Sequence, residues 1–225
     1  MLPRLPRAVV FDMDGLILDS EILYRKSVIS AATEKGLPIG PSIYEAMMGQ
    51  PWPGIAQLMT DHYGEDFDPD AFRTVWIDHF DRLIETELKL KAGVTALLDT
   101  LDRHGIPRAI CTSSAHHQVR HHLEGFGLLP RFDHVIAQGD YARGKPAPDP
   151  YLAAAERLGV APADCLALED SHNGIRSAAA AGMMAVMVPD LLAPTDEIVA
   201  LCARVAGSLD ECCAFFSEPL AAERA

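Results

Sequence analysis

The segment Asp12-Met13-Asp14-Gly15 places two carboxylates one residue apart, directly after the short apolar run Ala8-Val9-Val10-Phe11. A short apolar run that ends in acids and a glycine is typical of a buried strand leading into a turn. Two acids at this spacing can divide the work of covalent catalysis, because one can attack an electrophile while the other moves protons. The alternative is a solvated Asp-Gly turn that carries no chemistry.

Three more polar clusters follow apolar runs or lie in the loops between them. Thr112-Ser113-Ser114 and Glu169-Asp170 each end such a run, and Lys145 lies in the loop 144–149. Carboxylates hold hard cations such as Mg²⁺, while hydroxyls, backbone N–H groups and an ammonium can hold a phosphate. Each cluster could instead be a helix cap or a proline-rich turn. If the strands are parallel, however, all of these groups converge at one sheet edge, where ligands bind.

The elements that would position these groups alternate in type after residue 92. The expected strands cover residues 8–11, 108–112, 134–137, 165–168 and 184–188, and the expected helices cover 116–126, 149–158 and 171–181. The helix over 149–158 is expected to have Asp149 as its N-cap and Pro150 at its first position. Regular alternation predicts right-handed crossovers and a parallel sheet covered on both faces, which is a Rossmann-like α/β core.

The segment from residue 21 to about 88 differs, because it has helical spacing and no convincing strand. Ser42 with Glu45 is a candidate capping box, and Asp68-Pro69 is expected to open a long helix. We therefore expect a small α-helical cap domain over 19–88, inserted into a core of 1–18 and 89–225. Such an insert could act as a lid over the strand ends, or it could be a rigid appendage.

Composition limits the partners and the compartment. The 225 residues have a net charge of -13, which argues against nucleic acid or an anionic membrane as the main partner. The longest apolar stretch, 178–188, is too short to span a bilayer, and the apolar run after Arg7 is too short for a signal peptide. The five cysteines show no paired metal-type spacing, and an odd count fits a reducing cytosol. A cytoplasmic location is expected.

A histidine-rich stretch offers a competing metal site. His117 and His121 are one helical turn apart on the expected helix over 116–126, which is a spacing that can bind a transition metal. No third ligand of suitable type is evident nearby in sequence. A solvated helix face is therefore the expected structure.

The polar clusters, taken in order, resemble the motifs of a known superfamily. The segments 12–20, 112–114, 144–146 and 168–171 match the four motifs of the haloacid dehalogenase superfamily. The helical insert lies where the subgroup that includes β-phosphoglucomutase carries its cap. The runs 181–183 and 187–190 look most like the phosphatase members, which include pseudouridine-5′-phosphatase and sugar-phosphate phosphatases.

The resemblance implies roles for the acidic residues. Asp12 would attack phosphorus and form an aspartyl phosphate, and Asp14 would protonate the leaving oxygen and later deprotonate water. Mg²⁺ would be held by the carboxylates of Asp12 and Asp170 and by the backbone carbonyl of Asp14. Glu169 would be either a further metal ligand or a neighbour of the ligands, and the sequence leaves both possibilities open.

The resemblance also implies a substrate class. Lys145 and Thr112 would bind phosphoryl oxygens, with help from the Ser113 N–H group. We expect a Mg²⁺-dependent phosphatase that acts on a small phosphorylated metabolite, such as a sugar phosphate or a nucleoside monophosphate. The alternatives are a phosphohexomutase of the β-phosphoglucomutase type and a phosphate-binding regulator without turnover.

The insert departs from the mutase pattern. Tyr24 stands where the mutase has a catalytic histidine, and Trp52 stands where its cap has an arginine for a second phosphate. Loss of that cation disfavours a bisphosphate intermediate and favours transfer of phosphate to water. Tyr24, Gly49 and Trp52 are expected to line the cap side of the site and contact the leaving group. Their apolar character predicts a surface with no anchor for a second phosphate.

Overall fold

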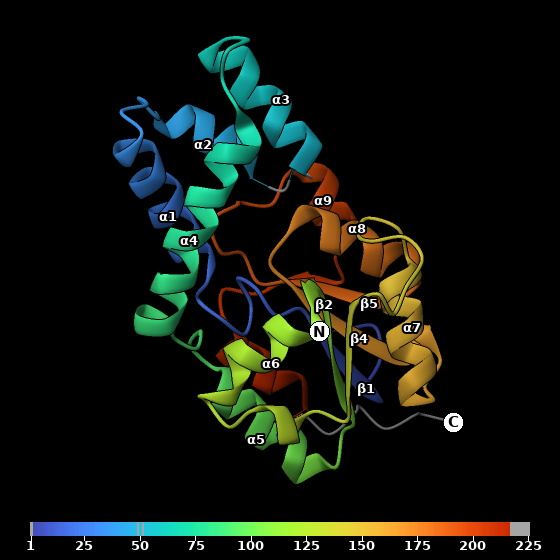
Figure 1. Ribbon diagram of the computed structural model, residues 1–225. Coiled ribbons are helices and arrows are strands. Elements are labelled where there is room, and N and C mark those ends of the chain that lie inside the picture. The colour runs from blue at the N-terminus through green and yellow to red at the C-terminus, as the bar shows by residue number, and fades with distance from the viewer. Residues whose placement is uncertain (1, 49, 51, 217–225) are drawn as a thin grey trace, which may run out of the picture. The chain divides into compact units, whose positions relative to one another are not determined.

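The computed structural model describes residues 2–48, 50 and 52–216. The chain divides into two compact units, one formed by residues 1–19 and 90–225 and the other by residues 20–89 (Figure 1). We call them the α/β unit and the helical unit. In the part of the chain that the structure describes, no helix combines the length and apolar character needed to cross a membrane.

The α/β unit is built on a parallel sheet of order β3-β2-β1-β4-β5-β6. The strands are β1 (Ala8–Phe11), β2 (Arg108–Ala115), β3 (His134–Gln138), β4 (Cys165–Glu169), β5 (Met184–Met187) and β6 (Arg204–Val205). This arrangement confirms the predicted Rossmann-like fold. Strand β2 continues past Thr112, where the sequence predicted its end, and its register with β3 shifts between Cys111 and Ala115. The short strand β6 was not predicted.

Helices cover the sheet on both faces, as expected for a doubly wound fold. The helices are α5 (Val94–His104), α6 (His116–Glu124), α7 (Asp149–Leu158), α8 (His172–Ala180), α9 (Asp196–Leu201) and α10 (Leu209–Cys212), with 3₁₀ turns η1 (Leu129–Arg131), η2 (Pro162–Asp164) and η3 (Cys213–Phe216). Val10 of β1 packs with Tyr151 of α7 and Ile175 of α8 on one face. Phe11 contacts the edge of the Phe132 ring. All four residues of β1 are fully buried, which explains their continuous apolar run.

The N-terminus of α7 corrects one prediction. Asp149 is the first residue of the helix and Pro148 is its N-cap, without a side-chain cap bond. The Asp149 carboxylate instead accepts two hydrogen bonds from the Arg143 guanidinium, at 2.7 and 3.1 Å. The Arg143 fork holds both oxygens of this carboxylate, and the N-cap position is taken by Pro148.

The helical unit consists of α1 (Glu21–Glu34), α2 (Pro41–Met47), α3 (Trp52–Tyr63) and α4 (Pro69–Glu87). Asp68 caps α4 as predicted, because its carboxylate accepts from the Ala71 N–H group at 3.0 Å. The capping box at Ser42 is wrong. Helix α2 begins earlier, at Pro41, with Gly40 as its N-cap. Proline favours the first helical position because its φ is already fixed near the helical value, so Ser42 falls inside the helix.

The two segments that connect the units lie side by side within the α/β unit. Leu18 and Leu90 form an antiparallel bridge, and the Lys91 N–H group donates to the Ile17 carbonyl at 2.9 Å. The Lys91 ammonium lies 3.4 Å from the Asp19 carboxylate and 2.6 Å from that of Asp190. The chain therefore leaves and re-enters the α/β unit at one anchored place.

Candidate active site

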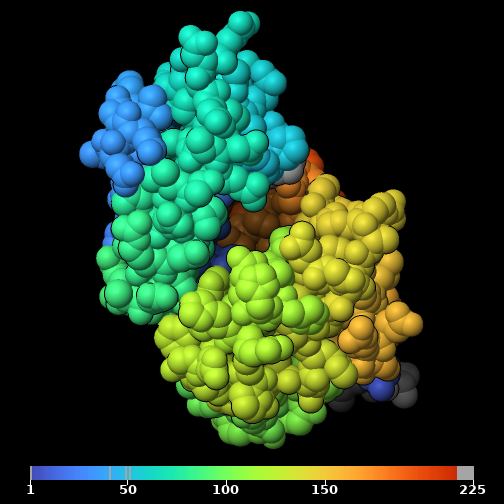
Figure 2. Space-filling model, in the orientation of Figure 1, coloured from blue at the N-terminus to red at the C-terminus, as the bar shows by residue number. Residues whose placement is uncertain are grey.

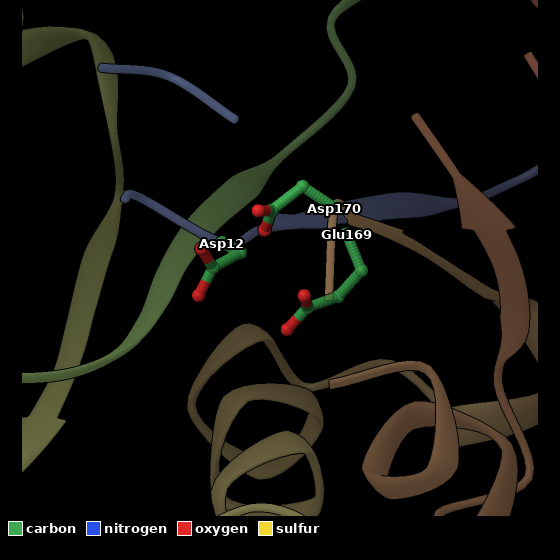
Figure 3. Close-up of side chains that lie close together, drawn as sticks. All are labelled: Asp12, Glu169 and Asp170. Carbon is green, nitrogen blue, oxygen red and sulfur yellow. The ribbon is translucent and has the colours of Figure 1, made fainter. Parts of the chain in front are cut away.

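Three buried carboxylates converge where β1 and β4 end. One ligand oxygen from each of Asp12, Glu169 and Asp170 lies within 4.8 Å of the others, and Figure 3 shows the three side chains close together. Phe11 pairs with Leu168, so the next residues of the two segments, Asp12 and Glu169, lie at the same level of the sheet. The strand order reverses between β1 and β4, which is where doubly wound folds bind their ligands.

Lys145 reaches this cluster from the loop before α7. Its ammonium lies 2.5 Å from the Asp12 carboxylate and 2.6 Å from that of Glu169, and it donates to the Cys111 carbonyl at 2.9 Å. An ammonium has three N–H donors, so all three are used. One cation among three carboxylates leaves the described cluster with an excess of buried negative charge.

Burial and mutual proximity shift the pKa values of Asp12 and Lys145. Burial raises the pKa of Asp12 well above its usual value, and the neighbouring Lys145 only partly opposes this. Burial by itself would lower the pKa of Lys145, but the carboxylates of Asp12 and Glu169 outweigh it and raise that pKa. Lys145 is therefore positively charged at neutral pH. Hard oxygen ligands with uncompensated negative charge fit a divalent cation such as Mg²⁺.

Glu169 is hydrogen-bonded on both oxygens. Its Oε1 accepts from Lys145 Nζ at 2.6 Å and from the Tyr151 hydroxyl at 2.8 Å. Its Oε2 accepts from Ser171 N at 3.2 Å and from Ser171 Oγ at 2.9 Å. A carboxylate offers about four lone-pair directions, so these donors saturate it. Direct coordination of a cation by Glu169 would require the loss of one of these bonds.

Asp14 and the hydroxyl residues after Cys111 form the neighbouring part of the site. The Ser114 hydroxyl donates to Asp14 Oδ2 at 2.9 Å, and the Ser114 N–H group donates to Thr112 Oγ1 at 3.0 Å. Thr112 is buried and Ser113 is exposed. Ser114 was not among the predicted site residues, although it belongs to the same polar cluster. Its contact with Asp14 joins residues 100 positions apart, which no local pattern reveals.

The residues predicted for the cap side lie in the helical unit, and Gly49 lies outside the described residues. The rings of Tyr24 and Trp52 both contact the Trp76 ring, with centroids 4.6 and 6.3 Å apart. The sequence predicted an apolar surface here. The structure adds a cation, because the Arg73 guanidinium lies 4.5 Å from the Trp52 ring centroid.

The histidine pair on α6 does not join the acidic cluster. His117 and His121 are both exposed, as expected for a solvated helix face, and the segment that holds α6 forms the near surface of the α/β unit (Figure 2, yellow-green). The single group of potential metal ligands found among the described residues is the buried carboxylate cluster. The exposed His116 lies 2.8 Å from the Asp140 carboxylate.

Gly174 allows α8 to approach Glu169, and its replacement gives a stability prediction. A Cβ atom at this position would lie 1.8 Å from the Glu169 carboxyl group. We expect Gly174→Ala to lower the free energy of unfolding by about 1–3 kcal/mol, because overpacking forces the helix or the carboxylate to move. Urea denaturation measures this change. Gly125→Ala is the control, since nothing lies within 4 Å of its added Cβ. Equal free energies of unfolding for the two variants would contradict the close approach of Gly174 to Glu169.

Comparison with known proteins agrees with this geometry. Residues 6–182 match the haloacid dehalogenase-like hydrolase family. The probable pseudouridine-5′-phosphatase of Drosophila melanogaster is 36% identical over 190 residues, which cover 80% of each chain. The fructose-1-phosphate phosphatase of Escherichia coli is 34% identical over 191 residues, covering 80% of this chain and 95% of that protein.

A solved structure extends the comparison to the fold. The structure of CbbY from Rhodobacter sphaeroides in complex with phosphate has a TM-score of 0.76 and 25% identity. The match covers 95% of this chain and 100% of CbbY. Family, relatives and fold agree: the chain belongs to the haloacid dehalogenase-like hydrolase family and is a phosphoric monoester hydrolase.

Proposed function

We propose that this protein hydrolyses small phosphate monoesters, sugar phosphates or nucleoside monophosphates, through an aspartyl phosphate on Asp12. The observation that carries the proposal is the buried contact between Asp12 and Lys145, 2.5 Å apart, beside the carboxylates of Glu169 and Asp170. A carboxylate held against an ammonium group is positioned to attack an anionic phosphoryl group. We also propose a cytoplasmic location, which the five free cysteines support.

In the first step, an Asp12 oxygen bonds to phosphorus and the ester P–O bond breaks. Asp14 donates a proton to the leaving oxygen, and the alcohol departs. In the second step, Asp14 takes a proton from water, whose oxygen attacks phosphorus and breaks the bond to Asp12. Inorganic phosphate is released, and Asp12 returns to its carboxylate form. The Ser114 hydroxyl holds the Asp14 carboxylate between these transfers.

The phosphoryl oxygens are proposed to bind Lys145, the Thr112 hydroxyl and the Ser113 N–H group. Lys145 exchanges one of its three present partners for the phosphoryl group. The carboxylates of Asp12 and Asp170 and the backbone carbonyl of Asp14 are proposed to hold Mg²⁺. When bound, the cation supplies positive charge that reduces the repulsion between nucleophile and substrate.

The proposed substrate class is supported by the relatives, two of which are named as phosphatases of pseudouridine 5′-phosphate and fructose 1-phosphate. A phosphate-release screen with Mg²⁺ across sugar phosphates and nucleoside monophosphates tests it. Release from at least one member supports the proposal. Binding of phosphate esters without any release would instead favour a phosphate-binding regulator.

A phosphohexomutase is the second candidate, because the chain shares its helical insert with that subgroup by resemblance. The assay that separates the two candidates mixes enzyme, glucose 1-phosphate and a bisphosphate activator. We expect inorganic phosphate to form and glucose 6-phosphate not to accumulate. Formation of glucose 6-phosphate faster than inorganic phosphate would overturn the phosphatase proposal.

The proposed contact of Tyr24, Gly49 and Trp52 with the leaving group gives a prediction. We expect Trp52→Ala to lower kcat/KM for the best metabolite substrate by roughly tenfold or more, while reaction with a small generic phosphate ester stays largely intact. The small ester draws little binding energy from remote contacts. Trp52→Phe is the conservative control and should retain most activity. An equal loss for both substrates would contradict a role in substrate selection.

A further inference from the structure

Tyr151 is a buried polar residue at the centre of the α/β unit that the proposed reaction does not use. It belongs to α7, is 0% exposed and packs in the core cluster beside Val10 and Ile175. A phenylalanine would fill nearly the same volume, so packing alone does not explain the hydroxyl. Buried tyrosine hydroxyls need a hydrogen-bond partner, and this one donates to Glu169 Oε1 at 2.8 Å.

The Tyr151 ring also contacts the second partner of Glu169. Lys145 Nζ lies 5.2 Å from the ring centroid, within the range of a cation–π interaction. Burial, followed by the nearby Glu169 carboxylate, raises the pKa of Tyr151 well above its usual value, so its hydroxyl stays a donor. Tyr151 therefore touches both members of the Lys145–Glu169 pair.

The contacts of Glu169 decide which oxygens a cation could use. Tyr151 and Lys145 occupy Oε1, and Ser171 occupies Oε2 with two donors. Gly174 packs directly against this carboxyl group, so it has little room to turn. Because the Glu169 carboxylate is fully hydrogen-bonded and confined, a cation would be coordinated by the neighbouring residues Asp12, Asp14 and Asp170 and by water. Mg²⁺ keeps several water ligands, whereas Ca²⁺ accepts six to eight oxygens in flexible geometry.

We propose that Tyr151 is a positioning residue that, together with Ser171, keeps Glu169 out of direct coordination and so sets the preference of the site for Mg²⁺ over Ca²⁺. This inference rests on the proposed magnesium site. Loss of the hydroxyl frees one lone pair on Oε1, and Glu169 then becomes an additional ligand. An additional carboxylate ligand favours the larger cation, because Ca²⁺ accepts more oxygen ligands than Mg²⁺.

The test is metal binding by isothermal titration calorimetry on the full-length, metal-free protein, with Mg²⁺ and Ca²⁺ as separate titrants. For Tyr151→Phe we expect the preference for Mg²⁺ over Ca²⁺ to fall by about tenfold, the scale of effect of residues that orient metal ligands. Tyr63→Phe is the matched control, because it removes another tyrosine hydroxyl bond, at 2.9 Å to Pro38 O in the helical unit. The control should keep the ratio of Mg²⁺ to Ca²⁺ affinity of the unsubstituted protein.

A double-mutant comparison separates positioning from general damage. In a Glu169→Gln background, Tyr151→Phe should no longer change the ratio of Mg²⁺ to Ca²⁺ affinity, since its effect acts through the Glu169 carboxylate. Ser171→Ala should shift the ratio in the same direction as Tyr151→Phe. Ser171 also caps α8, so Thr195→Ala, which removes the cap of α9, controls for cap loss. These two variants keep the inference testable even if Tyr151→Phe does not fold.

The outcomes are distinct from those of the proposed function. An unchanged ratio of Mg²⁺ to Ca²⁺ affinity in folded Tyr151→Phe protein overturns the inference, even if phosphate is released. If that variant does not fold, an unchanged ratio in Ser171→Ala overturns it. So does an absence of Mg²⁺ binding to the parent protein. Failure of every ester to release phosphate overturns the proposed function alone, because calorimetry reads metal binding without turnover.

Discussion

Replacing Asp12 by asparagine is expected to lower kcat/KM for phosphate release by roughly 10⁴-fold or more, the scale seen when a covalent nucleophile is removed. The amide has nearly the same shape as the carboxylate but cannot attack phosphorus. It also removes one negative charge from the cluster proposed to hold the cation. Initial rates with the best substrate from the screen measure the effect.

The fold of this variant is expected to survive. Asp12 is almost fully buried, and the asparagine oxygen can still accept a hydrogen bond from Lys145. Asp164→Asn is a matched control in the α/β unit, since its carboxylate forms surface ion pairs with Arg4 and Arg7. Circular dichroism checks that the Asp12→Asn protein is folded. Near-normal turnover by the folded variant would contradict the proposed mechanism.

Removal of divalent cations is expected to have an effect of similar size. Phosphate release should vanish in EDTA and return when Mg²⁺ is added in excess, because the buried carboxylates otherwise repel an anionic substrate. Ca²⁺ should restore activity poorly, since its looser and higher coordination misplaces the nucleophile. The measurement is the initial rate of phosphate release after chelation and after each metal is restored.

The matched control for chelation is EDTA already saturated with Mg²⁺, which should leave the rate unchanged. Unfolding by denaturant with and without EDTA shows whether loss of metal also loosens the fold. Full activity after rigorous chelation would exclude the role proposed for Asp170. Equal rates with Mg²⁺ and Ca²⁺ would contradict the argument from coordination geometry.

Local pattern was enough for the sequence to predict the parallel sheet and helices α6, α7 and α8, whereas α5, α9 and α10 were not predicted. Strand β1 was visible as a short apolar run, because both of its faces are buried and every residue must be apolar. The proximity of Asp12, Lys145 and Asp170 was also expected, since parallel strands deliver the residues at their carboxyl ends to one edge. The structure brings these three side chains together, while their catalytic roles remain proposals.

Helix termini were harder to predict, because neighbouring side chains compete for the same groups. Asp149 has the chemistry of an N-cap, yet its carboxylate pairs with Arg143. Ser42 also has that chemistry, yet Pro41 begins the helix before it. A capping motif indicates which bonds are available, but only the folded chain selects among them.

The partners of the functional groups were decided by tertiary structure alone. Tyr151 reaches Glu169 from a different element, and Ser114 reaches Asp14 across 100 positions. Arg73 lies over Trp52, where the sequence had indicated an apolar surface. The order of the motifs identified the chemistry because strand ends are set by local hydrophobic pattern. Which hydrogen bonds saturate Glu169 depends on how α7 and α8 pack on the sheet, and no spacing in the sequence encodes that packing.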